Sequence, residues 1–133
     1  LQFNSYRKKY LKMSKLGKTV SQRQLRVGEM VKQALGMIFL RGEAKLPNLE
    51  TREITVTEVR MSQDLKVAKA FVLPLGGKNS QEIVEKLKEF SFVIRKVLSK
   101  KITMKYLPKI LFVKDESFDY AEKIESLIKQ TNK

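Results

Sequence analysis

The 133-residue sequence predicts a single α+β domain with a three-stranded sheet. Three features support this class: a helical apolar repeat after Ser21, two β-branched stretches joined by a short polar turn, and a second helical region before a third β-rich stretch. A hairpin followed by a helical crossover to another strand places helices on one face of a small sheet. A chain of this length can bury one hydrophobic core, and its apolar fraction of 42% is ordinary for a globular protein.

The first predicted helix begins after Ser21, whose hydroxyl is suited to cap a helix N-terminus. Apolar residues then recur along one helical face at Val27, Val31, Ala34, Leu35 and Ile38. Gly42 is a suitable end for this helix, and the following "EAKLPNLETRE" reads as a loop.

A hairpin is predicted next, with its first strand at 54–61. In the connecting "SQDL", Ser62 and Asp64 can bond nearby backbone amides and hold a tight turn. The second strand is expected from Lys66 to Leu73, with Ala68, Ala70 and Val72 on one face and Val67, Lys69, Phe71 and Leu73 on the other. Since both faces are mostly apolar near Phe71, we expect this strand to be well covered.

Helical spacing returns from Ser80 to about Ile102, which is long for a domain of this size. A kink is therefore expected within "FSF" at 90–92, at Ser91 and Phe92, because Ser91 interrupts a bulky run. A Leu-Pro pair ends the helical region. The stretch "KILFVKD" then predicts the third strand, and "SFDYAEKIESLIKQ" predicts a short helix capped by Ser117. The expected divisions are a basic flexible arm at 1–20, a domain at 21–116, and a helix and tail at 117–133.

The charge pattern predicts a polyanionic partner. The formal net charge is +14 and the sequence pI is about 10.0, which favours nucleic acid first, an anionic membrane second and acidic proteins third. Residues 1–28 and 90–114 contain no acidic residue. The arm at 1–20 is compatible with a solvated tail, an RNA-gripping arm or an organellar presequence. No stretch approaches the roughly 20 apolar residues that a membrane-spanning helix needs.

Catalytic and cofactor chemistry finds little support. The chain has no Cys and no His, which removes thiolate sites and the commonest metal ligand and proton shuttle. There is no phosphate-binding loop and no dinucleotide-binding fingerprint. The paired acids Asp115–Glu116 and Asp119–Glu122 fit a solvated helix start better than a cation site. We therefore expect a non-enzyme without metal or cofactor.

The basic block after the expected kink is the first candidate for phosphate contacts. It holds Arg95, Lys96, Lys100, Lys101 and Lys105. Phe90 and Phe92 lie beside it and are compatible with stacking on bases, although a Phe at helical spacing is more often part of the core.

The predicted helix–strand–strand–helix–helix–strand order has the layout of a type II KH domain, but no GxxG tetrapeptide occurs. Several stretches resemble the bacterial ribosome-binding factor A family: "SQRQLRVGEMVKQAL", "ITVTEVRMSQDLKVAKAFV", "IRKVLSKKITMKYLPKILFVKD" and "SFDYAEKIESLI". The most specific element is the hairpin with Ser-x-Asp-Leu at its turn, followed by Ile-Arg, Leu-Pro and Leu-Phe-x-x-Asp. Each motif alone is weak, and their order and spacing make the set specific.

The resemblance implies a KH-like fold in which a helix–kink–helix replaces the GxxG loop. It implies binding to free small (30S) ribosomal subunits and help in late maturation of 16S rRNA, often in the cold, with a GTPase assisting release. It assigns RNA contacts to Arg23, Arg26, Arg95 and Lys96, leaving Lys66 and Lys69 of the hairpin available to rRNA. It implies a location in the bacterial cytoplasm, or in an organellar matrix for an organellar homologue. A monomer is the default expectation for such a basic module. The sequence departs from the family pattern at the kink, where relatives commonly have an Ala-x-Gly-like run.

Other functions remain as alternatives at this point. A general nucleic-acid-binding protein fits the same charge. A membrane-surface protein would use residues 1–20 as a basic adhesive. A metal-dependent nuclease would use acids near Asp115.

Overall fold

The computed structural model describes residues 20–77, 79–117 and 127–128. The chain forms two compact units: Val20–Lys114 is one, and Leu1–Thr19 together with Asp115–Lys133 is the other. The predicted arm at 1–20 and the predicted terminal helix lie almost entirely outside the described residues. The named helices and strands all fall within Val20–Lys114.

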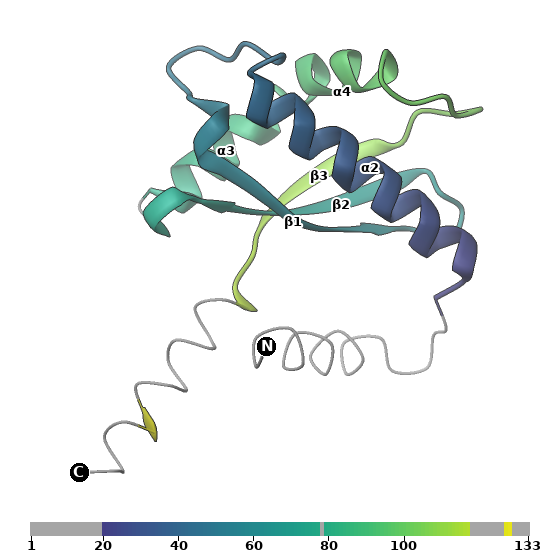
Figure 1. Ribbon diagram of the computed structural model, residues 1–133, viewed down its shortest axis with the longest axis horizontal. Helices are drawn as coiled ribbons and strands as arrows, with labels where there is room; N and C mark the ends of the chain where they lie inside the picture. Colours follow the sequence, from purple (N-terminus) through teal and green to yellow (C-terminus); the bar gives the residue numbers. More distant parts are fainter. Residues whose placement is uncertain (1–19, 78, 118–126, 129–133) are drawn as a thin grey trace. The chain divides into compact units, whose positions relative to one another are not determined.

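Three helices and three strands make up this unit, in the order helix, hairpin, two helices, strand (Figure 1). Their bounds are α2 (Gln22–Arg41), β1 (Ile54–Met61), β2 (Val67–Pro74), α3 (Ser80–Glu89), α4 (Ser91–Ser99) and β3 (Lys109–Lys114), with short 3-10 turns at Thr51–Glu53 and Leu75–Gly77. In the sheet, β2 is central, β1 is antiparallel to it and β3 is parallel to it. The predicted α+β class with a three-stranded sheet is confirmed.

The position of α2 follows from its ends and from one close contact. Ser21 Oγ accepts a hydrogen bond from Gln24 N at 3.1 Å, and Ser21 N donates to Gln24 Oε1 at 2.9 Å, which completes a capping box. Gly42 ends the helix at φ 64°, in the left-handed region that glycine tolerates. A Cβ on Gly28 would lie 2.7 Å from Val59 O. The helix therefore rests directly on the backbone of β1.

Strand β1 carries one residue more than its partner. Val56 pairs with Val72, whereas Glu58 pairs with Phe71, which leaves Thr57 as a β-bulge. The extra residue changes the alternation of faces along the strand. As a result, four β1 side chains share the buried face: Ile54, Val56, Val59 and Met61.

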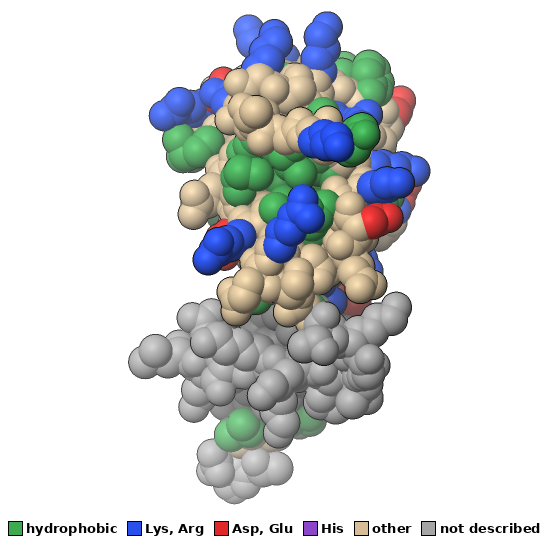
Figure 2. Space-filling model, turned by 90° about the vertical axis from the view of Figure 1, so that its right-hand side faces the viewer, with side chains coloured by type: hydrophobic (Ala, Val, Ile, Leu, Met, Phe, Trp, Pro, Cys, Tyr) green, Lys and Arg blue, Asp and Glu red, His purple; other side chains and the backbone are tan. Residues whose placement is uncertain are grey.

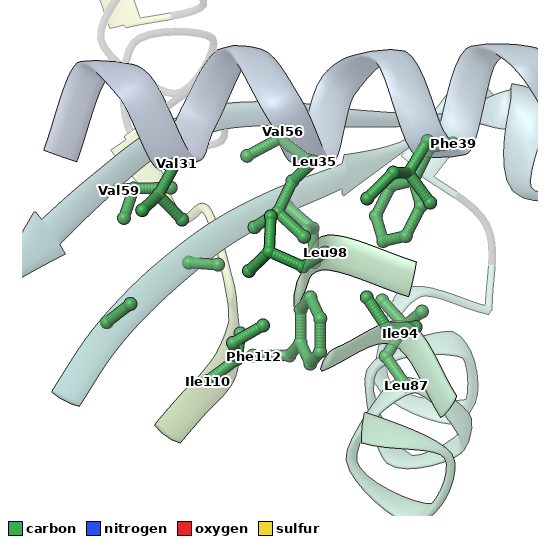
Figure 3. Close-up of a cluster of buried hydrophobic side chains, with 14 of the residues drawn as sticks. Val31, Leu35, Phe39, Val56, Val59, Leu87, Ile94, Leu98, Ile110 and Phe112 are labelled. Carbon is green, nitrogen blue, oxygen red and sulfur yellow. The ribbon is translucent and has the colours of Figure 1, made fainter. Parts of the chain in front are cut away.

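The three helices cover one face of the sheet, and the core lies between the helices and that face (Figure 1). Figure 3 shows side chains of α2, the strands, α3 and α4 converging in this layer. The rings of Phe39 in α2 and Phe112 in β3 stack with their centroids 6.2 Å apart. Burying such side chains contributes about 1.5–3 kcal/mol each, so helix–sheet packing is the main source of stability.

The two faces of β2 differ. Ala68, Ala70 and Val72 are fully buried under the helices. On the other face, Phe71 is half-buried and Lys69 is exposed. The strand is therefore well covered, as expected, on the side that faces the helices. Its other side is only partly covered by the described residues.

The helical region breaks at Phe90, which has φ −103° and ψ 20° and separates α3 from α4. The break lies within the predicted segment 90–92. It falls at Phe90, however, so the prediction of a kink at Ser91 and Phe92 is wrong by one residue. Ser91 instead begins α4, and Phe92 in its first turn is 68% exposed. Phe90 packs against the core, which fixes the chain where its backbone leaves the helix.

Candidate nucleic-acid interface

Three segments meet at the end of the sheet where β1 turns into β2. Gln24 Nε2 donates to Met61 O at 3.1 Å, which joins the start of α2 to the end of β1. Lys109 N donates to Lys66 O at 2.8 Å, which joins the start of β3 to the start of β2. We call this region the hairpin end and define it as residues 21–26, 61–66 and 105–109.

Figure 2 views the molecule from the side on which the hairpin end lies. Hydrophobic side chains gather in the middle of this face, and Lys and Arg side chains surround and cross them. Apolar surface framed by cations is suited to RNA, which presents phosphates beside the flat faces of its bases.

The turn of the hairpin is held by its own side chains. Ser62 Oγ donates to Asp64 Oδ1 at 2.7 Å and accepts from Val67 N at 3.0 Å, while Lys66 N donates to Asp64 Oδ1 at 3.1 Å. The hydrogen bond from the Ser62 hydroxyl, followed by that from the Lys66 amide, lowers the pKa of Asp64 below its ordinary value. Ser62 and Asp64 therefore fix the turn and, with it, the backbone position of Lys66.

Cations dominate the hairpin end. The exposed cations of its three segments are Arg23, Arg26, Lys66, Lys105 and Lys109, and Asp64 is the one acidic residue in those segments. The structure therefore brings together four of the nine residues predicted to contact RNA, which come from a helix start, a turn and the loop before β3. Such a cluster attracts phosphates with little local compensation.

Arg95 has a different position from the one expected of a free RNA contact. Its Nε donates to Pro108 O at 3.1 Å and its Nη2 donates to Leu107 O at 2.8 Å. These bonds tie α4 to the loop before β3. Arg95 thus positions the segment that carries Lys105 and Lys109.

The other predicted lysines of this region are spread along the end of α4. Lys96 and Lys100 are exposed there, and Lys96 lies in the last turn, where a cation complements the helix dipole. Lys101 Nζ lies 2.6 Å from Glu43 Oε2 and links this end of α4 to the loop after α2. Lys101 is therefore engaged within the protein.

Lys69 lies on the sheet face opposite the helices. Its Nζ is 5.6 Å from the centroid of the Phe71 ring, and the guanidinium carbon of Arg60 is 5.0 Å from the same centroid. Both distances are within the range of cation–π contacts. Lys69 therefore belongs to a cluster across β1 and β2, separate from the three segments of the hairpin end.

Sequence reasoning missed Tyr106. Its side chain is 66% exposed, and Lys105 Nζ lies 5.6 Å from its ring centroid. A signal was available, because the residue stands between a lysine and the Leu-Pro pair that ends the helical region. The partners of Arg95 and Lys101 carried no such local signal.

The opposite end of the sheet has the opposite character. A surface hollow of about 440 Å³ is lined there by Glu50, Glu53, Glu82 and Lys86, among others. We call this region the pocket end and define it as residues 48–54, 74–75 and 79–86. The Arg52 side chain lies 3.2 Å from Glu50 Oε1, and its hydrogen bond and charge lower the pKa of that carboxyl.

The described residues add no support for a metal site or a membrane span. They contain no cluster of three or more His, Cys, Asp or Glu that could hold a metal ion. Asp115 Oδ1 accepts hydrogen bonds from both the amide and the hydroxyl of Ser117, at 2.9 and 2.6 Å. No helix in the described parts of the chain is both long enough and apolar enough to cross a bilayer.

Comparison with known proteins identifies the family. Residues 23–128 match the model of the family described as ribosome-binding factor A. The chain belongs to that family. Its described unit shows the helix–strand–strand–helix–helix–strand order of the family's KH-like fold, with the break at Phe90 where a conventional KH domain has its GxxG loop.

Relatives in the ribosome-binding factor A family align over most of their length. A ribosome-binding factor A of Pelagibacter ubique is 76% identical over 119 residues, covering 90% of this chain and 98% of the relative. The factor of Paracoccus denitrificans is 44% identical over 110 residues, covering 83% of this chain and 80% of its own.

Solved structures agree in fold at lower identity. The crystal structure of ribosome-binding factor A from Thermus thermophilus matches with a TM-score of 0.56 at 21% identity, covering 68% of this chain and 94% of that chain. A homology model of the Thermus thermophilus factor, fitted into a cryo-electron-microscopy map of a complex between the 30S subunit and that factor, matches with a TM-score of 0.53, covering 67% and 91%.

Proposed function

We propose that this protein binds the free small ribosomal subunit through its hairpin end and assists late maturation of 16S rRNA by non-covalent contacts. The observation that carries the proposal is the cluster of exposed cations at one end of the sheet, formed by Arg23, Arg26, Lys66, Lys105 and Lys109. Family membership and the relative fitted into a 30S complex support the choice of partner.

The proposed mechanism is selection of one rRNA conformation. The capping box at Ser21, the Ser62–Asp64 turn and the Arg95 bonds each fix one cationic segment. A fixed arrangement of cations binds best to the rRNA conformer whose phosphates match it. Such binding shifts the rRNA population only by the difference in affinity between conformers. No covalent step is required, in keeping with a chain that has neither His nor Cys.

Further contacts and partners are part of the same proposal. Lys96 and Lys100 on α4 and Lys69 on the sheet would extend the contact beyond the hairpin end, whereas Arg95 and Lys101 would act through the segments that they hold. The family resemblance favours the bacterial cytoplasm and a GTPase maturation factor that assists release, and a monomer is the default for such a basic module.

The test is charge reversal with a matched control. Arg23→Glu with Arg26→Glu should lower affinity for purified free small subunits at least about tenfold, because phosphate contacts are lost. Each lost contact should also reduce the salt slope, which is the slope of log affinity against log salt concentration, by about 0.7–0.9. The control is Arg41→Glu with Lys45→Glu, which changes the net charge equally at exposed positions outside the hairpin end. Co-sedimentation over a range of salt concentrations measures both effects.

Circular dichroism would verify that both double variants fold. If the hairpin-end variant binds small subunits as tightly as the unchanged chain, or if the control loses as much, binding does not occur through this end.

A further inference from the structure

Tyr106 combines exposure with a fixed backbone. The side chain is 66% exposed, yet the residues that follow it are anchored: Arg95 donates to the carbonyls of Leu107 and Pro108, and Pro108 is fully buried. One exposed aromatic residue is ordinary on a protein surface. An exposed aromatic residue beside a segment held in place by a buried proline and two guanidinium bonds is a pre-organised contact, because little loop entropy is lost on binding.

The surroundings of Tyr106 match a nucleotide and its backbone. Lys105 Nζ lies 5.6 Å from the ring centroid. Lys109 begins β3 next to Lys66, whose carbonyl accepts from the Lys109 amide at 2.8 Å. Cations thus lie on both sides of the aromatic residue along the chain, as phosphates lie on both sides of each base in a single strand.

We propose that Tyr106 stacks on an unpaired base of RNA while Lys105, Lys109 and Lys66 contact the adjoining phosphates. The ligand class is single-stranded RNA, since a base must be unstacked to receive the ring, and a duplex presents only its backbone and grooves. This inference rests on the proposed RNA binding, and it specifies which kind of rRNA segment the hairpin end recognises.

A single tryptophan gives a direct test, because the chain contains no Trp. In Tyr106→Trp, an oligouridylate about ten nucleotides long should quench the indole fluorescence on binding, and a blunt RNA duplex of similar length should not. Leu75→Trp is the matched control: Leu75 is 77% exposed and lies at the pocket end, beside Glu50, Glu53 and Glu82. Its fluorescence should stay unchanged with either RNA.

Affinity measurements separate stacking from charge. By fluorescence anisotropy of labelled oligouridylate, Tyr106→Leu should bind about 5- to 150-fold more weakly, with an unchanged salt slope, and Tyr106→Phe should bind as the unchanged chain does. Lys105→Gln should instead reduce the salt slope by about 0.7. Duplex affinity should be the same for Tyr106→Leu and the unchanged chain.

Several results would overturn the stacking role: equal quenching at positions 75 and 106, unaltered oligouridylate affinity in Tyr106→Leu, or equal losses for single strand and duplex. If Tyr106→Leu weakens binding to small subunits but not to oligouridylate, the ring contacts a ribosomal protein and the proposal is wrong. Because these assays use free RNA, their outcome is independent of whether the chain co-sediments with small subunits.

Discussion

The two ends of the sheet carry opposite charge although the same strands run between them. The three segments of the hairpin end contain five exposed cations and one acidic residue, whereas the pocket end places Glu50, Glu53 and Glu82 around a hollow. A net charge of +14 would suggest a uniformly basic surface. Within Val20–Lys114, the segregation instead separates basic from acidic surface along the sheet, so that the hairpin end is the end of this unit that attracts a polyanion.

The two ends also differ in how their segments are connected. Next to the hairpin end, α2 rests on the β1 backbone at Gly28, and at that end hydrogen bonds to main-chain carbonyls join the three segments. At the pocket end, the described links between segments include the bond from Lys86 Nζ to Asn48 O at 3.3 Å, made by a long and solvated side chain. The segments of the hairpin end are therefore joined through main-chain carbonyls.

The largest expected effect comes from the two glycines of α2. Gly28→Ala should lower the free energy of unfolding by about 1–3 kcal/mol, because its Cβ would meet Val59 O at 2.7 Å and neither backbone can move freely. Gly36→Ala has open space around its Cβ and should raise the same quantity by about 0.5–1 kcal/mol. Urea denaturation of both variants measures the difference. Equal effects of the two substitutions would show that α2 lies no closer to a neighbouring backbone at Gly28 than at Gly36.

A smaller effect is expected at Arg95. Arg95→Met removes the donors to Leu107 O and Pro108 O and should cost about 1 kcal/mol of unfolding free energy. Amide hydrogen exchange should accelerate in residues 103–107 and stay unchanged at the pocket end.

Lys96→Met is the matched control for Arg95→Met, since it removes the same charge from the neighbouring exposed position. Exchange in residues 103–107 that responds equally to both variants would mean that charge, and not the two hydrogen bonds, orders the loop.

The smallest effect concerns one carboxylate at each end. The pKa values of Asp64 and Glu50 both lie below their ordinary values of 3.8 and 4.5. A lowered folded-state pKa means that each carboxylate stabilises the fold above its ordinary pKa, and that this contribution is lost as the pH falls through the lowered value. Asp64 owes its shift mainly to neutral donors, whereas Glu50 owes its shift to Arg52.

Salt should therefore distinguish the two ends. Raising the ionic strength from 0.1 to 1 M shortens the screening length from about 10 to about 3 Å, which should move the pKa of Glu50 back toward 4.5 more than that of Asp64 toward 3.8. Titration of the side-chain carboxyl carbons by NMR at both salt concentrations checks this. A larger salt response at Asp64 would contradict the assignment of neutral donors as its main influence.

Features that depend on local chemistry could be predicted from the sequence. Ser21 and Gly42 cap α2 through residues within one turn, and β1 has the bounds that its β-branched pattern predicted. The helix break was displaced by one residue because packing of Phe90 against the core decides where the backbone turns. Propensity alone favours the small Ser91 and carries no information about that packing.

The candidate site was predictable in composition and less so in geometry. The sequence identifies a basic block, but Lys101 pairs with Glu43 and Arg95 with carbonyls before β3, and these partners are brought near by folding. Which cations remain free for RNA therefore depends on long-range contacts. The grouping of Lys105 with Lys66 likewise depends on β3 lying parallel to β2, and that of Arg23 depends on the contact between the start of α2 and the end of β1.

The bulge at Thr57 determines where β1 can lose a residue without disturbing the sheet. Because Val56 and Glu58 already pair with the consecutive residues Val72 and Phe71, a chain lacking Thr57 would keep every cross-strand partner and the inward or outward direction of each neighbouring side chain. The local twist would relax, and the hydrogen bond from Thr57 Oγ1 to Phe71 O would be lost. Loss of a residue elsewhere in β1 has no such ready compensation, since it would direct polar side chains inward, so natural or engineered length variation in this strand should concentrate at Thr57.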